Sequence, residues 1–347
     1  MQPPRCGLPP LRVGGAGGGD DCDSMRLDSA AASSAQDSAS CAGSLASLDD
    51  VSEGADDDAA EDSGAFHSAG WRVGKRLDCG LGPARRAMDA DTGRMFVVKP
   101  IEVSLPEGSK DSMAQEVRRL DADLRAWRSF RHPHVVRILG HLWEPGLLTL
   151  HLECSAAGTL AGMLADFGPF GLHQARRCGR GILEGLAFLH SRRPRLAHGH
   201  LRAACVVIDA GLNAKLTDFG LAGRPSLGGD GVGGVGRPAA APWAAPEAPR
   251  REVRDIAPSA DVWAFGCTAL EMLTGGVAWA RGASPARIAS ALAAPAALFR
   301  GGEAMAALAV LPALALDLVR ECLQWSPADR PRASALLRHS YLADAQH

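Results

Sequence analysis

The chain has 347 residues, of which 46% are hydrophobic, enough for one large domain of two lobes or for two ordinary domains. Its net charge of −2 and its lack of an apolar run long enough to cross a bilayer argue against nucleic acid and membrane as partners. The nine cysteines are scattered without a C-x-x-C pair, which predicts reduced thiols in a cytoplasmic protein rather than disulfides or structural zinc.

The first part of the chain, residues 1–67, is a mixed run of Gly, Ala, Ser and Asp with almost no aromatic or β-branched residues. Such a composition cannot bury enough apolar surface to offset chain entropy. We therefore predict a disordered acidic tail at 1–67, followed by a folded domain at 68–347.

Order is expected to begin near Trp71. Residues 71–103 predict three strands separated by a Gly-rich turn and a hairpin turn, and the third strand carries Lys99. Residues 112–130 have apolar side chains at spacings of three and four, which predicts an amphipathic helix. Two further apolar strands are predicted at 135–139 and 147–152.

Beyond residue 155 the sequence predicts mainly helices, interrupted by the segment 197–220. That segment holds a short loop, a strand at 206–208, a turn and a second strand at 214–217, and it ends on Asp-Phe-Gly at 218–220. A helix that is apolar almost all round follows at 261–275, as expected at the centre of a lobe.

The segment 197–220 resembles the catalytic loop and magnesium loop of a protein kinase, which read H-R-D-L-K-x-x-N and D-F-G. Further kinase-like motifs follow in order: A-P-E at 245–247, D-V-W-A-F-G at 261–266 and W-S-P-A-D-R-P at 325–331. The run at 160–193 resembles the MAP kinase kinase kinase group. We identify the chain as a member of the protein kinase superfamily, of serine/threonine type.

This resemblance implies an α+β, bilobal protein kinase fold. A small antiparallel β lobe with one helix is expected at 68–155, and a large, mainly helical lobe is expected at 156–347. Arg330 is expected to form a buried ion pair with Glu247.

The resemblance also implies ATP and Mg²⁺ as ligands. Lys99 falls on the lysine that contacts the α- and β-phosphates, and Asp218 falls on the aspartate that holds magnesium. The acid that pairs with the lysine falls on Asp123, with Glu116, two turns earlier on the same helix face, as the alternative.

Four more positions complete the implied nucleotide site. Gly80 and Gly82 take two of the glycine positions of the phosphate loop, where the backbone approaches phosphate closely. Glu153 and Ser155 fall on the hinge between the lobes.

Several catalytic positions carry other residues. His200 falls on the catalytic aspartate, Arg202 on the lysine that follows it, and Cys205 on the asparagine that holds magnesium. Gly199 replaces the arginine of the loop, and Ala240 replaces the threonine before A-P-E. These replacements favour a catalytically impaired protein that acts as a scaffold or allosteric partner of other kinases in a phosphorylation cascade.

An active ATP-dependent serine/threonine kinase stays open as the alternative. Lys99 and Asp218 remain, and phosphoryl transfer depends mainly on positioning and charge neutralisation. An imidazole at His200 with the ordinary pKa near 6.5 would be able to accept a proton in place of the aspartate.

Overall fold

The computed structural model of the chain describes residues 70–78, 80, 82–103, 110–155, 157–221, 243–247, 257–276 and 311–343. The predicted tail at 1–67 and the segment that carries Ala240 lie outside these residues.

The small lobe is built on a five-stranded antiparallel sheet with strand order β1-β2-β3-β5-β4. The strands are β1 (Trp71–Asp78), β2 (Pro83–Asp89), β3 (Met95–Glu102), β4 (Ile138–Glu144) and β5 (Leu147–Glu153). β3 is buried along most of its length because it lies in the middle of the sheet, between β2 and β5. This sheet confirms the predicted β lobe.

β4 begins later than the predicted strand at 135–139. Val135 forms an isolated bridge with Leu216, and the Val136 N–H donates to the Leu216 carbonyl oxygen at 2.8 Å. The apolar pair 135–136 therefore joins the large lobe, and the strand of the small sheet starts at Ile138.

The predicted helix at 112–130 corresponds to α1 (Lys110–Trp127), which ends three residues early. Its last turn tightens, because the N–H groups of Ser129 and Phe130 donate to carbonyl oxygens three residues earlier, at 3.2 and 3.0 Å. The apolar face is confirmed by three buried side chains: Leu120, Leu124 and Trp127.

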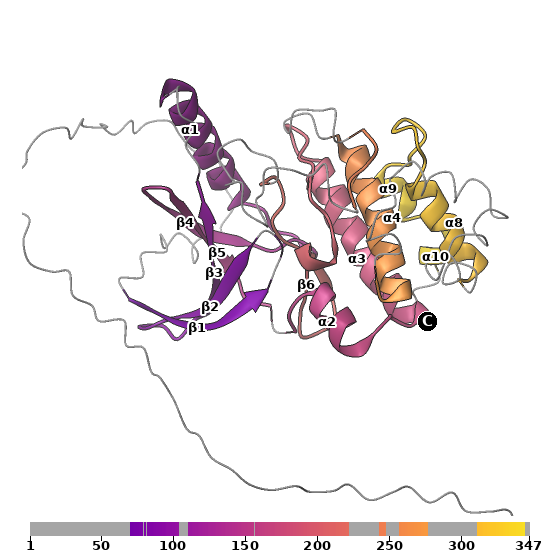
Figure 1. Cartoon of the computed structure of the whole chain (residues 1–347), viewed down its shortest axis with the longest axis horizontal. Helices are drawn as coiled ribbons and strands as arrows, with labels where there is room; N and C mark the ends of the chain where they lie inside the picture. Colours follow the sequence, from indigo (N-terminus) through magenta and orange to yellow (C-terminus); the bar gives the residue numbers. More distant parts are fainter. Residues whose placement is uncertain are drawn as a thin grey trace, which may run out of the picture. The chain divides into compact units, whose positions relative to one another are not determined.

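The large lobe is mainly helical, as predicted. It contains α2 (Leu160–Phe167), α3 (Leu172–His190), α4 (Pro258–Thr274), α8 (Ala313–Cys322), α9 (Ala333–Leu336) and α10 (Ser340–Ala343), and a hairpin of β6 (Val206–Ile208) and β7 (Ala214–Leu216). Figure 1 shows α3 and α4 side by side, and α8 also packs on α4. Every residue of α4 from Asp261 to Met272 is buried, as its all-round apolar sequence predicts. Within the described residues, no helix combines the length and apolarity needed to span a membrane.

The predicted Arg330–Glu247 ion pair is present. Two guanidinium nitrogens of Arg330 donate to the two carboxylate oxygens of Glu247 at 2.6 and 2.9 Å, and the Arg330 side chain is fully buried. The same guanidinium donates to the carbonyl oxygens of Ser259, Gln324 and Trp325. This bidentate pair therefore ties the A-P-E segment to the end of the lobe.

We predict that Arg330→Ala lowers the free energy of unfolding by about 3–5 kcal/mol, because it leaves the Glu247 carboxylate without its partner. Urea denaturation of the full chain measures this change. The exposed Arg338 provides the matched control, since Arg338→Ala should change the free energy by less than about 0.5 kcal/mol. Equal stability of Arg330→Ala and wild type would refute a stabilising role for the pair.

Candidate active site

The loop at 197–205 is fixed by a buried carboxylate of α4. Asp261 accepts hydrogen bonds from the backbone N–H groups of His198 and Gly199, both at 2.8 Å, and its Oδ2 lies 2.8 Å from His190 Nε2. Burial acts to raise the pKa of Asp261, but the bonds from His190 and Gly199 outweigh it, so the pKa lies below its ordinary value. The ionised carboxylate holds the loop by its backbone, independently of most of the loop's side chains.

His200, at the position of the catalytic aspartate, is held neutral. Burial is the largest cause that lowers its pKa to about 3, and the nearby Arg202 and His198 act in the same direction. Its Nε2 is buried and has no hydrogen-bond partner in the part of the chain that the structure describes. Because an efficient general base has a pKa near the working pH, His200 is a weak base in this setting.

Cys205, at the position of the magnesium-binding asparagine, is a fully buried thiol in the short 3₁₀ turn Ala203–Cys205. Burial raises the pKa of Cys205 to about 12, and the carboxylate of Asp218 acts in the same direction. The thiol therefore stays protonated at neutral pH. Since magnesium prefers oxygen ligands, Cys205 does not replace the asparagine chemically.

The structure pairs Lys99 with Asp218, whereas the sequence predicts Asp123 or Glu116 as the partner of Lys99. Lys99 Nζ lies 2.5 Å from Asp218 Oδ2, and both side chains are fully buried. β3 presents Lys99 opposite Leu150 of β5. Asp218 follows β7 with a φ of 66°, and the next residue, Phe219, packs its ring against Trp127 of α1 with centroids 5.5 Å apart. The pair thus links the small sheet to the large lobe.

Gly80 lies directly over this ion pair. Its N–H donates to the Ala204 carbonyl oxygen at 2.8 Å, and its own carbonyl oxygen accepts from Arg202 Nη2 at 2.6 Å. A Cβ at Gly80 would lie 1.7 Å from Asp218 Oδ2, so only glycine fits there. We call these contacts of Gly80 the glycine clamp. The other predicted loop glycine, Gly82, has a φ of 110°, and a Cβ there would meet no atom within 4 Å.

A cavity of about 100 Å³, here called the hinge pocket, lies at the end of β5. The predicted hinge residues Glu153 and Ser155 both line it. The Glu153 carboxylate is bound by Lys215 Nζ at 2.6 Å, and the Glu153 backbone N–H donates to the Arg137 carbonyl oxygen at 3.0 Å. The other lining residues are mostly apolar or small: Leu77, Val97, Val136, Leu152, Gly158, Thr159, Val207 and Thr217.

The two acids considered as helix partners of Lys99 lie on α1. Glu116 is buried and Asp123 is half-buried, and both line a separate cleft of about 880 Å³ between α1 and residues 191–199. Asp218 is one partner of Lys99. Pairing of Lys99 with Asp123 stays a prediction.

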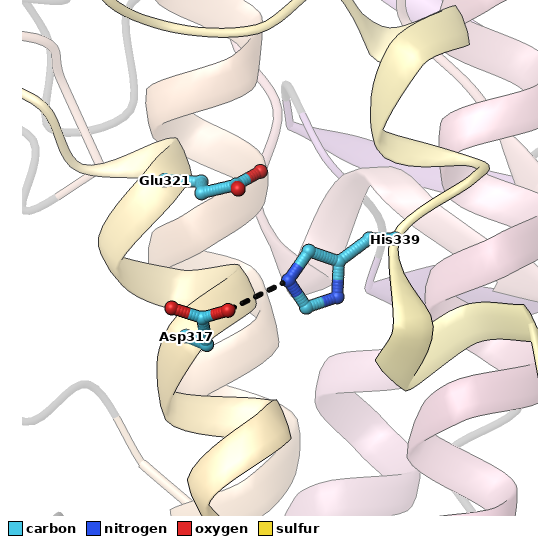
Figure 2. A group of neighbouring side chains, drawn as sticks. All are labelled: Asp317, Glu321 and His339. Carbon is cyan, nitrogen blue, oxygen red and sulfur yellow. Dashed lines mark hydrogen bonds and ion pairs between the residues drawn. The ribbon is translucent and has the colours of Figure 1, made fainter.

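A group of potential metal ligands lies away from this site. Asp317 and Glu321 on α8 and His339 before α10 each place one ligand atom within 4.8 Å of the others (Figure 2). However, His339 Nδ1 accepts the Tyr341 N–H at 3.1 Å, so the proton of the neutral ring sits on Nε2, which faces Asp317 at 3.3 Å. A metal at Nε2 would require the opposite tautomer. His339 is therefore explained as the N-terminal cap of α10.

Comparison with known proteins identifies the family. The family model for the protein kinase domain matches residues 79–342. The chain belongs to the protein kinase family. A solved structure of Rad53 residues 1–466 in complex with AMP-PNP shares the kinase fold with a TM-score of 0.59 at 22% identity, covering 79% of this chain and 65% of that one.

Curated relatives of this kinase domain include mitogen-activated protein kinase kinase kinases. ANP1 of Arabidopsis thaliana is 29% identical over 276 residues, which cover 78% of this chain and 40% of ANP1. Mitogen-activated protein kinase kinase kinase A of Dictyostelium discoideum is 27% identical over 277 residues, covering 80% of this chain and 28% of the relative. The chain thus spans less than half the length of these relatives.

Protein kinases use ATP with magnesium, and the described site does not fit a magnesium-bound triphosphate. Lys99 and Asp218 are present, but they bind each other and Gly80 covers them. Arg202 is bound to the Gly80 carbonyl oxygen, and Cys205 offers no oxygen ligand. The groups that would receive phosphates and metal in this kinase domain are therefore engaged or replaced.

Two parts of the site were not predicted from the sequence. The anchoring role of Asp261 had a signal, because an acid within a mostly apolar helix needs a buried partner. The Ala204 carbonyl oxygen that binds Gly80 had none, since any residue supplies a carbonyl group.

We predict that His200 makes the kinase domain sensitive to mild acid. The unfolded imidazole, with a pKa near 6.5, takes up a proton below that pH, whereas the folded one stays neutral down to about pH 3. Stability is therefore lost as the pH falls below 6.5. Between pH 7 and pH 5, the free energy of unfolding of wild type should fall by about 2 kcal/mol more than that of His200→Gln. Parallel pH profiles in urea denaturation would contradict the burial of a neutral imidazole.

Proposed function

We propose that this domain is a catalytically impaired protein kinase that acts as a scaffold or allosteric partner of other kinases in a phosphorylation cascade. The observation that carries the proposal is the half-buried, neutral His200 in the position of the catalytic aspartate, with its pKa lowered to about 3. Aspartate at that position accepts the proton of the substrate hydroxyl and aims its oxygen. A weakly basic, uncharged ring supports neither task well.

The residues at two other catalytic-loop positions, Cys205 and Gly199, support the same proposal. A protonated thiol at Cys205 replaces an oxygen ligand, and Gly199 removes the arginine that would bind a phosphate on the activation segment. The frame around these positions is intact, since Asp261 still holds the loop and Arg330 still binds Glu247. A preserved fold with an altered site is suited to binding other proteins.

The relatives supply the class of partner. By their names, they are kinases in the cascade that leads to mitogen-activated protein kinases, and this chain shares their kinase domain at 27–29% identity. We therefore propose protein kinases of such a cascade as the partners, with the interior of a cell as the setting.

One observation favours the alternative of an active ATP-dependent kinase. The Lys99–Asp218 ion pair and the contact between Phe219 and Trp127 hold the Lys99 ammonium and the Asp218 carboxylate side by side, and an active kinase needs both groups. The alternative also needs a basic residue at position 200. The low pKa of His200 weighs against it.

Repair of the site tests the proposal. At millimolar ATP with magnesium, wild type should transfer no radiolabelled phosphate to a generic protein substrate above the blank. The triple variant His200→Asp, Cys205→Asn, Ala240→Thr should transfer phosphate at about 100-fold or more above the detection limit set by the blank, because a positioned base contributes at least that factor. The matched control replaces His200→Asp by His200→Asn, which has the same shape without the charge and should stay at the blank. Transfer by wild type that disappears in His200→Gln would overturn the proposal.

A further inference from the structure

The hinge pocket differs from the neighbouring region around Gly80, Lys99 and Asp218 in the kind of ligand that it can accept. The pocket is lined mainly by apolar side chains, and Glu153 is the one charged residue among its described lining residues. Since Lys215 already neutralises the Glu153 carboxylate and the Glu153 N–H already donates to the Arg137 carbonyl oxygen, a ligand in the pocket meets mainly apolar walls. These surroundings suit a flat, uncharged ring.

The volume of the hinge pocket limits the size of that ligand. Pockets that hold a drug-sized molecule measure roughly 300–1,000 Å³, whereas the hinge pocket measures about 100 Å³. Val97 and Leu152 narrow it from the small lobe, and Val207 closes it from the large lobe. A single heterocyclic base is therefore of the right order of size, and a whole nucleoside triphosphate is not.

The glycine clamp occupies the direction in which phosphates would extend. Gly80 stands so close to Asp218 that a single added carbon would lie 1.7 Å from its carboxylate oxygen. The two cations of this region are already engaged, Lys99 by Asp218 and Arg202 by the Gly80 carbonyl oxygen. A phosphate chain would have to break these contacts and would then face the Asp218 carboxylate.

We infer that the hinge pocket binds a neutral, planar nucleobase or nucleoside, and that each added phosphate weakens binding instead of strengthening it. This inference concerns the same cleft as the proposed loss of phosphoryl transfer and deepens that proposal by naming the class of ligand. It rests on the glycine clamp and on the pocket walls. The proposed loss of transfer rests on His200 and Cys205.

Titration calorimetry of the full chain with adenosine, AMP, ADP and ATP, each with magnesium and with EDTA, tests the inference. We expect adenosine to bind at least about tenfold more tightly than ATP, because ATP must displace the charge-assisted bond between Arg202 and Gly80. Magnesium should not improve the binding of ATP. Tighter binding of ATP with magnesium than of adenosine, or no binding of adenosine, would overturn the inference.

Two variants test where adenosine binds and whether Arg202 opposes or assists the binding of ATP. Val207→Phe fills the hinge pocket from a half-buried position and should abolish adenosine binding. Arg202→Met opens the glycine clamp and should increase the affinity for ATP relative to adenosine. If Arg202 instead binds a phosphate of ATP, the same variant will weaken ATP binding, and the inference is wrong. Should Val207→Phe fail to fold, the sign of the Arg202→Met effect still decides.

The binding data and the transfer assay separate the two proposals. Tight binding of ATP with magnesium without phosphate transfer would remove the inference about the hinge pocket and leave the proposed function standing. A preference for adenosine together with phosphate transfer would remove the proposed function and leave the inference. The two failures are therefore distinguishable.

Discussion

The structure depends on one buried carboxylate, Asp261. Asp261 lies in the first turn of α4 and accepts hydrogen bonds from the backbone N–H groups of His198 and Gly199. Its carboxylate also lies within hydrogen-bond distance of His190. A buried carboxylate is tolerated only when it is well bonded, so this network fixes the loop against α4. Two of the three contacts are to backbone atoms. The loop therefore keeps its course when the side chain at position 199 or 200 changes.

This anchoring through the backbone explains how the loop can carry other residues at the catalytic positions without changing its course. His200 and Cys205 are held as neutral groups by burial, and His200 Nε2 has no hydrogen-bond partner within the described residues. The Arg202 guanidinium donates a hydrogen bond to the Gly80 carbonyl oxygen. Gly80 of the phosphate loop thus contacts Arg202 and Ala204 of the catalytic loop directly.

Much of this account was predictable from the sequence because it rests on side chains at fixed spacing. The Arg330–Glu247 pair followed from motifs, since complementary charges placed by a known fold pair with each other, whereas the Lys99–Asp218 pair was not predicted. The clamp at Gly80 was not predicted, because it joins the backbone of Gly80 to the Arg202 side chain, 122 positions away, and to the Ala204 carbonyl oxygen, and so depends on the course of a loop. The start of β4 was also wrong, because an apolar pair such as 135–136 has the same pattern whichever lobe it joins.

The central claim is that Lys99 now has a structural role and no catalytic one, and Lys99→Met tests it most directly when phosphate transfer and stability are measured on the same preparation. The account predicts that wild type and variant both stay at the blank for transfer. It also predicts that the variant loses about 3–5 kcal/mol of unfolding free energy, because Asp218 remains buried without Lys99. Measurable transfer by wild type that Lys99→Met abolishes would contradict the account.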